Sequence, residues 1–272
     1  MYETTYHRPS SLAEAASLFS SSGDAAYLSG GHTLLPAMKA RLAAPGNLID
    51  LRRIPELKGI QVSGDTVAIG GATTHAEVSA SAEVKRACST LAALAGSIGD
   101  AQVRHLGTIG GSVANNDPAA DYPAAVLALD GIVHTDRRQV PVDSYFTGMY
   151  STALAEGEIV TRVSFRIPET SGYAKFRNPA SRYPMAGVFV AKHKDGSIRV
   201  AVTGAGNGGV FRWADAERAL AGAFTAEALK GLTVPVAAMM GDIHGSPEYR
   251  ANLVAVMARR AVQHQGTALA MI

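Results

Sequence analysis

Two periods of hydrophobic and polar positions run along the chain, and together they predict a mixture of helices and strands. Helical spacing is clearest in residues 12–19, where the capping-box pattern Ser11 to Glu14 marks the start. Strand-like alternation or short apolar runs occupy residues 25–28, 47–51, 60–71, 159–167 and 186–206. The segments 60–71 and 186–206 each carry a glycine-containing turn at the centre, which predicts two β-hairpins.

Further helices are predicted between and after these strands. A second capping box, Thr74 to Glu77, precedes a small-residue helix within residues 83–99, and Asp121 precedes Tyr122-Pro123 as the N-cap of another helix. Later helices are expected near residues 213–221, near 225–231 and from Pro247 onward. Because helices and hairpins are interspersed without sustained βαβ alternation, the pattern predicts an α+β fold.

Two glycine pairs flanked by small hydroxyl residues carry the candidate chemistry. Residues 29–33 read SGGHT and follow a predicted strand, and residues 108–112 read TIGGS. Such loops expose backbone N–H groups with no Cβ in the way, and a concavity of this kind binds phosphate oxygens. Each loop alone is compatible with an ordinary turn, but the repetition favours two parts of one anion-binding site.

A third glycine cluster, GAGNGG at residues 204–209, matches the pattern of a nicotinamide-dinucleotide fingerprint. That fingerprint also requires a second parallel strand that ends in an acidic residue about 20 positions further on. The corresponding stretch here, TAEALKGLTV, is helix-like, and the preceding strand belongs to the hairpin 186–206. We therefore interpret residues 204–209 as a glycine-rich turn.

Composition excludes several other classes of function. The chain has 272 residues, 47% of them hydrophobic, which is enough for a sizeable core. A net charge of +2 gives no indication of nucleic-acid binding, and no apolar stretch approaches the roughly 20 residues that span a bilayer. The N-terminus lacks the pattern of a signal peptide, and the single cysteine, Cys88, cannot hold an iron–sulfur cluster alone. These features predict a cytoplasmic protein without a membrane span.

The two loops, taken with their surroundings, resemble a known family. The stretches LSGGHTLLPAMKARLAAPGNLIDL and QVRHLGTIGGSVANNDPAADYPAAVLAL look like the FAD-contacting segments of the medium subunit of molybdenum hydroxylases. Carbon monoxide dehydrogenase medium chains and the flavin domain of xanthine dehydrogenase represent this family. The later stretches YAKFRNPASRYPMAGVFVA and VTGAGNGGVFRWADAERALAG look like its C-terminal domain, so the resemblance covers essentially the whole chain.

The resemblance implies a p-cresol methylhydroxylase-type FAD-binding fold. Two α+β subdomains, residues 1–57 and 58–168, would clamp FAD between them. A C-terminal α+β domain with a small antiparallel sheet, residues 169–272, would cover the isoalloxazine. The Pro168–Gly172 stretch, which follows the predicted strand 159–167, agrees with the second of these boundaries.

The resemblance also implies a set of cofactor contacts. The first loop would wrap the pyrophosphate of FAD with Ser29, Gly30, Gly31, His32, Thr33 and Leu34. The second loop would contact the pyrophosphate and ribityl chain with Thr108, Ile109, Gly110, Gly111 and Ser112. Elsewhere, Asp121 would hydrogen-bond the cofactor, Val160 would give a backbone contact on the adenine side, and Lys175 would match the family's late lysine contact.

Several of these residues have an alternative interpretation. Asp121 also fits a helix N-cap, and Lys175 also fits a solvated surface lysine. Arg104 could approach a phosphate, but a structural hydrogen bond to loop carbonyls is favoured. Tyr183 and Met185 could reach the flavin ring or could pack in a core.

His32 separates two modes of flavin attachment. Some oxidases of the same superfamily have the sequence S-G-G-H, and their histidine bonds covalently to the flavin. Medium chains of molybdenum hydroxylases often carry a histidine here with FAD held non-covalently. The resemblance to medium chains favours non-covalent FAD in this protein.

The function that the resemblance implies is electron transfer within a larger complex. A large partner subunit would hold the molybdenum cofactor, and a small partner would hold two [2Fe-2S] clusters and pass electrons to FAD on this chain. An external acceptor would then take them, and the complex would be a dimer of heterotrimers. One alternative is a free-standing FAD-dependent oxidase or reductase of the same superfamily; another is a scaffold that has lost FAD.

Overall fold

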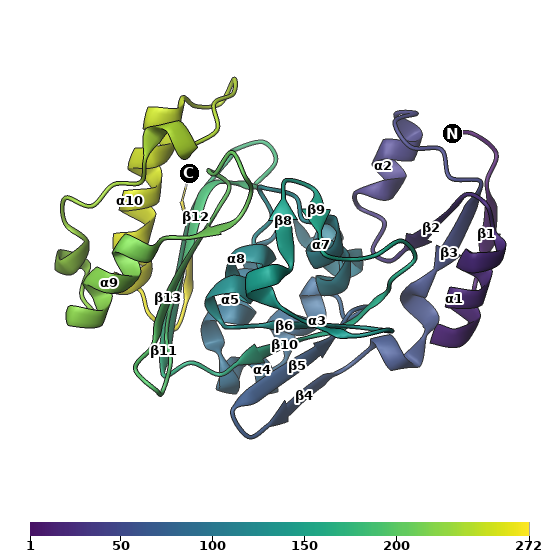
Figure 1. Ribbon diagram of the computed structural model, residues 1–272, viewed down its shortest axis with the longest axis horizontal. Coiled ribbons are helices and arrows are strands. Elements are labelled where there is room, and N and C mark those ends of the chain that lie inside the picture. Colours follow the sequence, from purple (N-terminus) through teal and green to yellow (C-terminus); the bar gives the residue numbers. More distant parts are fainter. Residues whose placement is uncertain (272) are drawn as a thin grey trace.

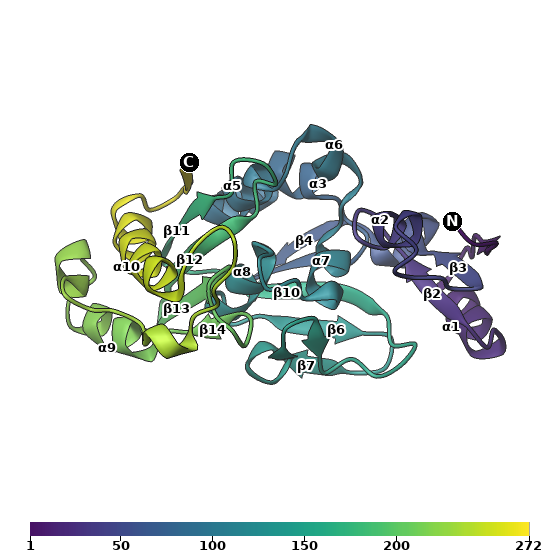
Figure 2. The ribbon, with the colours of Figure 1, turned by 90° about the horizontal axis from the view of Figure 1, so that it is seen from above.

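The computed structural model describes residues 1–271 and contains three main sheets, which follow one another along the chain, and one two-stranded ribbon (Figure 1). Their strand orders are β1-β3-β2, β4-β5-β10-β6-β7 and β14-β13-β12-β11-β15. Seen from above, the three sheets and their helices form an elongated molecule, with the N-terminus on the first sheet and the C-terminus on the third (Figure 2). The predicted α+β fold is confirmed.

The first sheet is parallel throughout. It contains β1 (Thr5–His7), β2 (Ala25–Leu28) and β3 (Asn47–Asp50), with β3 paired in parallel to both neighbours. The crossovers are α1 (Leu12–Ser21) and α2 (Leu34–Lys39). The sequence did not predict β1 or this local βαβαβ order, because three residues are too few to show a period. All three strands therefore end at the same edge of the sheet, and β2 runs there directly into the first glycine loop.

The second sheet is antiparallel and supports most of the helices. Its strands are β4 (Ile60–Ser63), β5 (Thr66–Gly70), β6 (Ile132–Thr135), β7 (Gln139–Pro141) and β10 (Val160–Arg166). The helices between β5 and β6 are α3 (His75–Ala80), α4 (Ala82–Ala87), α5 (Ser89–Ser97), α6 (Ala101–Leu106), α7 (Ile109–Asn115) and α8 (Tyr122–Ala128). The hairpin predicted at 60–71 is confirmed, whereas the helix predicted within 83–99 is broken at Cys88 into α4 and α5.

The third sheet is covered by helices on both faces. Its strands are β11 (Thr170–Arg177), β12 (Pro184–Lys192), β13 (Ile198–Thr203), β14 (Phe211–Arg212) and β15 (Ala268–Met271), and β15 runs parallel to β11. Figure 1 shows α9 (Ala214–Gly222) and α10 (Pro247–Gln263) on the outer face and α5 and α8 on the inner face. A small ribbon, β8 (Phe146–Gly148) with β9 (Ser151–Thr152), lies along the chain between β7 and β10 of the second sheet.

Shorter segments complete the fold. Residues 225–231, predicted as a helix, contain only the 3-10 turn Ala226–Leu229, and further 3-10 turns occur at Leu51–Arg53, Pro55–Leu57, Val142–Ser144 and Val236–Ala238. The cluster 204–209 follows a strand of an antiparallel hairpin and has positive φ at Gly204 and Gly209, so its interpretation as a turn is confirmed. No helix among the described residues is long and apolar enough to cross a membrane.

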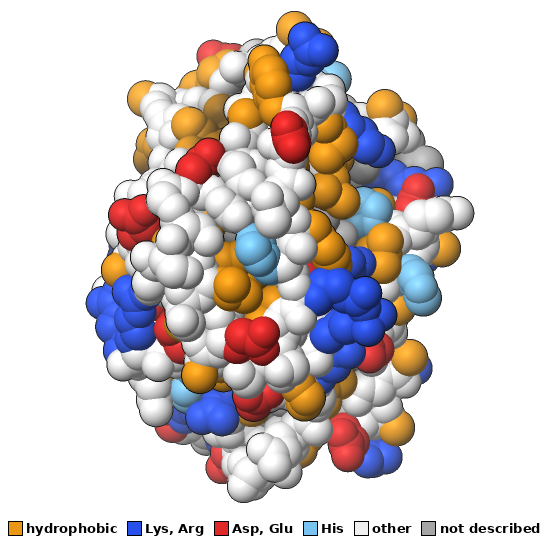
Figure 3. Space-filling model, turned by 90° about the vertical axis from the view of Figure 1, so that its right-hand side faces the viewer, with side chains coloured by type: hydrophobic (Ala, Val, Ile, Leu, Met, Phe, Trp, Pro, Cys, Tyr) orange, Lys and Arg blue, Asp and Glu red, His pale blue; other side chains and the backbone are white. Residues whose placement is uncertain are grey.

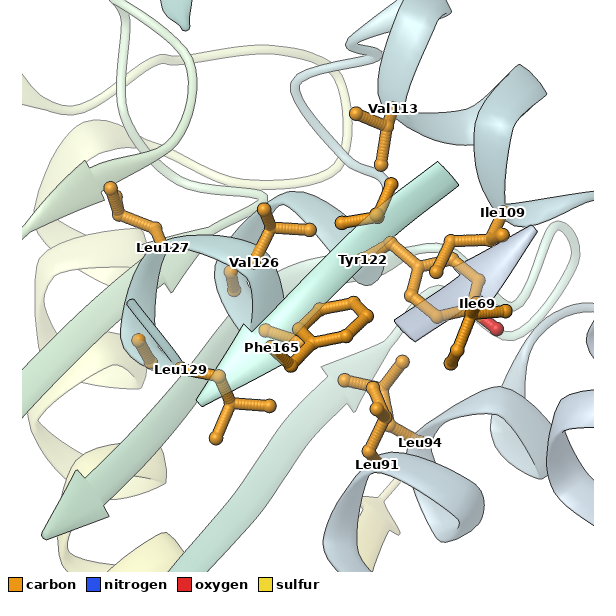
Figure 4. Close-up of a cluster of buried hydrophobic side chains, with 14 of the residues drawn as sticks. Ile69, Leu91, Leu94, Ile109, Val113, Tyr122, Val126, Leu127, Leu129 and Phe165 are labelled. Atoms are coloured by element: carbon orange, nitrogen blue, oxygen red, sulfur yellow. The ribbon is translucent and has the colours of Figure 1, made fainter. Parts of the chain in front are cut away.

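The central core joins the second sheet to the third. Tyr122 and Phe165 pack in it beside residues of α5, α7 and α8 (Figure 4), and the same cluster includes Tyr173 and Phe189 from the third sheet. The opposite face of the third sheet packs on α10 through a separate set that includes Val188. Because alternate strand residues point to opposite faces, β11, β12 and β13 contribute to both cores. The division into residues 1–57, 58–168 and 169–272 stays a prediction.

Candidate functional site

A cleft of about 560 Å³ lies between the first sheet and the helices of the second sheet, and both glycine loops line it. The size is typical of a site for a small molecule or cofactor. The predicted contacts that line the cleft are Ser29, Gly30, Gly31, His32, Thr33, Leu34, Thr108, Gly110, Gly111, Ser112, Asp121 and Val160. Ile109 and Lys175 are not among the lining residues, and both side chains are completely buried.

The first loop presents free backbone donors to this cleft. It follows β2 and turns at Gly31, whose φ of +76° suits glycine. Within residues 1–271, no acceptor of the protein receives the backbone N–H groups of residues 30–34. Backbone amides that are unpaired at the wall of a cleft are ready to bind the oxygens of an anion.

The second loop has the same appearance but uses its donors internally. The N–H of Ile109 donates to the carbonyl of Thr73 (3.1 Å), and that of Gly110 donates to the carbonyl of Gly71 (2.9 Å). The N–H of Gly111 donates to the Thr108 hydroxyl (3.2 Å), which caps α7. The amides of residues 109–111 therefore already have partners within the protein. This loop contributes closely packed surface to the cleft and not free N–H donors.

The two loops contact each other directly. The hydroxyls of Ser29 and Thr108 are 2.8 Å apart and hydrogen-bonded. A Cβ at Gly30 would lie 2.5 Å from the carbonyl oxygen of Leu106 and 2.6 Å from the Cα of Gly107. Gly30 thus permits a backbone contact that no other residue allows. The prediction that both loops approach one place is supported by this geometry.

Asp121 lies at the end of the cleft nearest the third sheet. It occupies the N-cap position of α8, but its carboxylate makes no capping hydrogen bond, so that part of the prediction is wrong. Its Oδ1 instead accepts from the Tyr173 hydroxyl (2.6 Å) and from Lys175 Nζ (2.8 Å). Lys175 is 0% exposed, which rules out the solvated surface lysine.

For Arg104, Met185 and Tyr183, the sequence left a choice between a structural role and contact with the cofactor. Arg104 donates to the carbonyls of Ile98 (2.9 Å) and Gly99 (3.2 Å), which confirms a structural role. Met185 is buried in the outer core of the third sheet, whereas Tyr183 lines the cleft and is 45% exposed.

His75 is a cleft residue that the sequence analysis missed, because it lies inside a capping box and carries no pattern of its own. Its backbone N–H donates to the carbonyl of Gly107 (2.9 Å), and its buried ring nitrogen Nδ1 has no partner among the described residues. Burial, with smaller contributions from the nearby charges of His32 and Arg104, lowers the pKa of the imidazole to about 4. At neutral pH the cleft wall therefore holds an uncharged imidazole beneath both loops.

The lining changes character along the cleft. Apolar side chains of Leu51, Leu57 and Ile159 line it on the side of the first sheet, and Asp117, Asp121 and Tyr183 line it towards the third. The free amides of residues 30–34 lie on the first loop, which follows β2. An apolar wall, a row of unpaired donors and polar acceptors suit a long cofactor that carries a planar base, phosphates and hydroxyl groups. The residues present therefore fit a flavin dinucleotide.

A second hollow, of about 380 Å³, lies at the carboxyl edge of the first sheet, and it is lined by Tyr6, Arg8, Asp50, Arg52 and Arg53. The Asp50 carboxylate, which is 2% exposed, accepts from the Arg52 guanidinium and from the Tyr6 hydroxyl. Figure 3, which faces the first sheet, shows Lys and Arg side chains gathered in one part of this face. We assign the hollow no ligand.

Comparison with known proteins agrees with this fit. Residues 2–170 match the family model described as the FAD binding domain in molybdopterin dehydrogenase. The chain is 36% identical to the carbon monoxide dehydrogenase medium chain of Hydrogenophaga pseudoflava, covering 94% of this chain and 95% of that one. It is also 36% identical to the nicotine 6-hydroxylase medium subunit of Paenarthrobacter nicotinovorans, covering 96% of each.

Comparison with solved structures also relates the chain to carbon monoxide dehydrogenase. The structure of carbon monoxide dehydrogenase from Hydrogenophaga pseudoflava, in a form that lacks the Mo-pyranopterin moiety of its cofactor, superposes with a TM-score of 0.86 at 33% identity. The match covers 96% of both chains. Fold and cleft thus define a flavin-binding oxidoreductase subunit. The chain belongs to the family of FAD-binding domains in molybdopterin dehydrogenases, the flavin subunits of molybdenum hydroxylases.

Proposed function

We propose that this chain holds FAD non-covalently and transfers electrons through it in a molybdenum hydroxylase complex. The observation that carries the proposal is the row of unpaired N–H groups at residues 30–34 on the cleft wall. These amides bind the pyrophosphate, whose negative charge and oxygens match them. The second loop supports the pyrophosphate and ribityl chain through Thr108, Gly110, Gly111 and Ser112.

The remaining contacts lie towards the two ends of the cleft. Near the first sheet, the backbone at Val160 and the apolar wall receive the adenine. Towards the third sheet, Asp121 accepts a hydrogen bond from the cofactor. Bound FAD accepts electrons singly or in pairs and gives them up in either way, whereas the chain orients the cofactor and tunes its surroundings.

The partners follow from the relatives. Their names describe medium chains or subunits of enzymes that act on carbon monoxide and on nicotine, two substrates with little in common. We infer that substrate recognition belongs to a large molybdenum-binding partner, and that a small partner with [2Fe-2S] clusters delivers the electrons. An external acceptor removes them, and the complex assembles as a dimer of heterotrimers.

Purification from the native source tests this proposal against a free-standing oxidase or reductase. We expect the chain to co-purify with a large and a small partner, with FAD, molybdenum and iron in the complex. FAD absorbance that bleaches when substrate is added and returns when an acceptor is supplied would support electron transfer through this chain. A solitary yellow protein that turns over a substrate without partners would establish the free-standing alternative.

Attachment of the flavin is tested separately at His32. Acid or denaturant should release all of the flavin from the polypeptide, and the mass of the denatured chain should equal that of its sequence. A chain that keeps a flavin-sized mass addition, lost in His32→Ala, would contradict non-covalent binding.

A further inference from the structure

The wall of the cleft between α7 and α8, residues 117–121, is held by the third sheet. The Thr203 hydroxyl, with its one proton, lies within hydrogen-bond distance of the carbonyls of Ala120 (2.7 Å) and Pro118 (3.1 Å), and the N–H of Gly204 donates to the carbonyl of Pro118 (2.8 Å). Asp121, at the end of this segment, accepts from Tyr173 and Lys175 of β11. Tyr173, Lys175 and Thr203 belong to the third sheet and Gly204 directly follows β13, whereas the segment 117–121 follows α7, whose start forms the second loop.

The register of the third sheet places these donors together. Lys175 lies opposite Gly187, and Gly187 lies opposite Thr203, so the three residues form one row across β11, β12 and β13. Cross-strand partners share a face of the sheet, and Tyr173 shares it too, because it is two residues from Lys175. A Cβ at Gly187 would lie 2.6 Å from the Tyr173 hydroxyl, so the glycine leaves the room that this hydroxyl occupies.

The network contains one buried ion pair, between Lys175 and Asp121. Lys175 is completely buried, and its ammonium donates to Asp121 Oδ1 and to the carbonyl of Ser97 (3.0 Å) at the end of α5. Both donors to the Asp121 carboxylate reach Oδ1, and within residues 1–271 no protein donor reaches Oδ2. Since Asp121 lines the cleft, the carboxylate is anchored through one oxygen and keeps the other for a ligand.

We propose that Lys175 and Tyr173 are positioning residues for FAD, which act on the cofactor through Asp121 without touching it. They fix the carboxylate so that a hydroxyl or N–H donor of the cofactor meets an acceptor already in place. Cofactor affinity thereby depends on the third sheet, which binds no part of the pyrophosphate itself. This inference rests on the proposed function, because it requires FAD in the cleft.

A double-mutant cycle on the purified complex, stripped of flavin and titrated with FAD, tests the inference. Lys175→Met removes the ammonium and leaves a buried carboxylate without its partner, so the dissociation constant of FAD should rise about tenfold or more. In an Asp121→Asn background, Lys175→Met should change the dissociation constant of FAD less than about threefold. Tyr173→Phe, which keeps the ring and should fold normally, should follow the same dependence with a smaller effect.

The control is Val188→Ala, which opens a cavity on the opposite face of the same sheet. It should lower the melting temperature while leaving FAD affinity and the visible circular dichroism of the bound flavin unchanged. Lys175→Met and Tyr173→Phe should alter that spectrum, which a loss of stability alone would not do.

Two outcomes would overturn the inference, and they differ. If Lys175→Met weakens FAD binding equally with Asp121 and with Asn at position 121, Lys175 acts directly or through general stability, and the proposed function survives. If the wild-type complex, with this chain present, takes up no FAD at all, the proposed function fails together with the inference.

Discussion

The two glycine loops look alike in sequence and differ in what they offer a ligand. In the first loop, the backbone amides of residues 30–34 have no acceptor within the described chain. In the second, the amides of Ile109 and Gly110 are already bonded to carbonyls of the segment that follows β5, and the amide of Gly111 is bonded to the helix cap. The first loop therefore offers free N–H donors to a ligand. The second loop is bonded to the rest of the fold and contacts the first loop through the Ser29–Thr108 hydrogen bond.

The glycines differ for the same reason. A Cβ at Gly110 would lie 2.5 Å from the carbonyl oxygen of Gly71, inside the fold, whereas a Cβ at Gly30 would lie between the two loops. A glycine pair in a sequence thus indicates close backbone approach, but it does not say whether a ligand or the protein itself makes that approach. Mutations can separate the two cases.

Gly30→Ala should have the largest effect on the cofactor. The added Cβ meets backbone atoms of Leu106 and Gly107, which cannot rotate away, so the first loop must move from the second. We expect FAD affinity to fall on the order of 100-fold, measured by titration of the flavin-free complex. Gly23→Ala, where a Cβ meets nothing within 4 Å, is the matched control. Unchanged affinity in Gly30→Ala would remove the first loop from the site.

Gly110→Ala should mainly lower the free energy of unfolding, and any effect on FAD affinity should be secondary to this loss of stability. Its Cβ would overlap the Gly71 backbone in a buried position, and overpacking of this kind costs about 1–3 kcal/mol. The free energy of unfolding should therefore fall by that amount in the flavin-free chain, measured by denaturant titration. Gly222→Ala, at an open position at the end of α9, should be close to neutral. Equal stability of the Gly110→Ala and Gly222→Ala chains would contradict the supporting role of the second loop.

His75, which lies beneath both loops, predicts a pH dependence. The pKa of its imidazole is about 4 in the folded chain and 6.5 when unperturbed, so the unfolded chain binds the proton more readily as the pH falls. Stability should therefore be lost as the pH falls from 6.5 towards 4, and about 2 kcal/mol should be gone at pH 5.

The measurement compares the wild type with His75→Gln at pH 8 and pH 5, both flavin-free. The contributions of titratable groups that do not interact with His75 are common to both chains and cancel in the difference. A wild type that loses no more stability than His75→Gln between the two pH values would contradict a buried neutral imidazole at this position.

Local patterns predicted the loops well because their chemistry is local. The strand before Ser29, the hairpin at 60–71 and the glycines themselves are all visible within a few residues. The pairing of Lys175 with Asp121 was not, because it depends on how β11 docks on α8. The alternation of Tyr173 and Lys175 on one face of a strand was the one available signal, and it does not identify the partner.

The failures have the same physical origin. Asp121 occupies an N-cap position, and its residue type favours capping, yet two donors from the third sheet take its carboxylate instead. The capping box of Thr74 and Glu77 forms as predicted, but it gave no sign that His75, which lies between them, is buried at the cleft with its N–H bonded to the carbonyl of Gly107. At Asp121 contacts distant in sequence overrode the local preference, and at His75 such a contact added a role that the local pattern does not show.

Ser29→Ala should have the smallest effect and tests the link between the loops most directly. It removes only the hydrogen bond between the Ser29 and Thr108 hydroxyls, which is worth about 1 kcal/mol. Ser21→Ala, which removes a hydroxyl bonded to a carbonyl of its own helix, is the control. In a cycle with Thr108→Val, the effects on FAD affinity should be less than additive by about that amount. Additive effects would mean that each loop holds its position alone, and that the contact between them follows from the fold without contributing to the site.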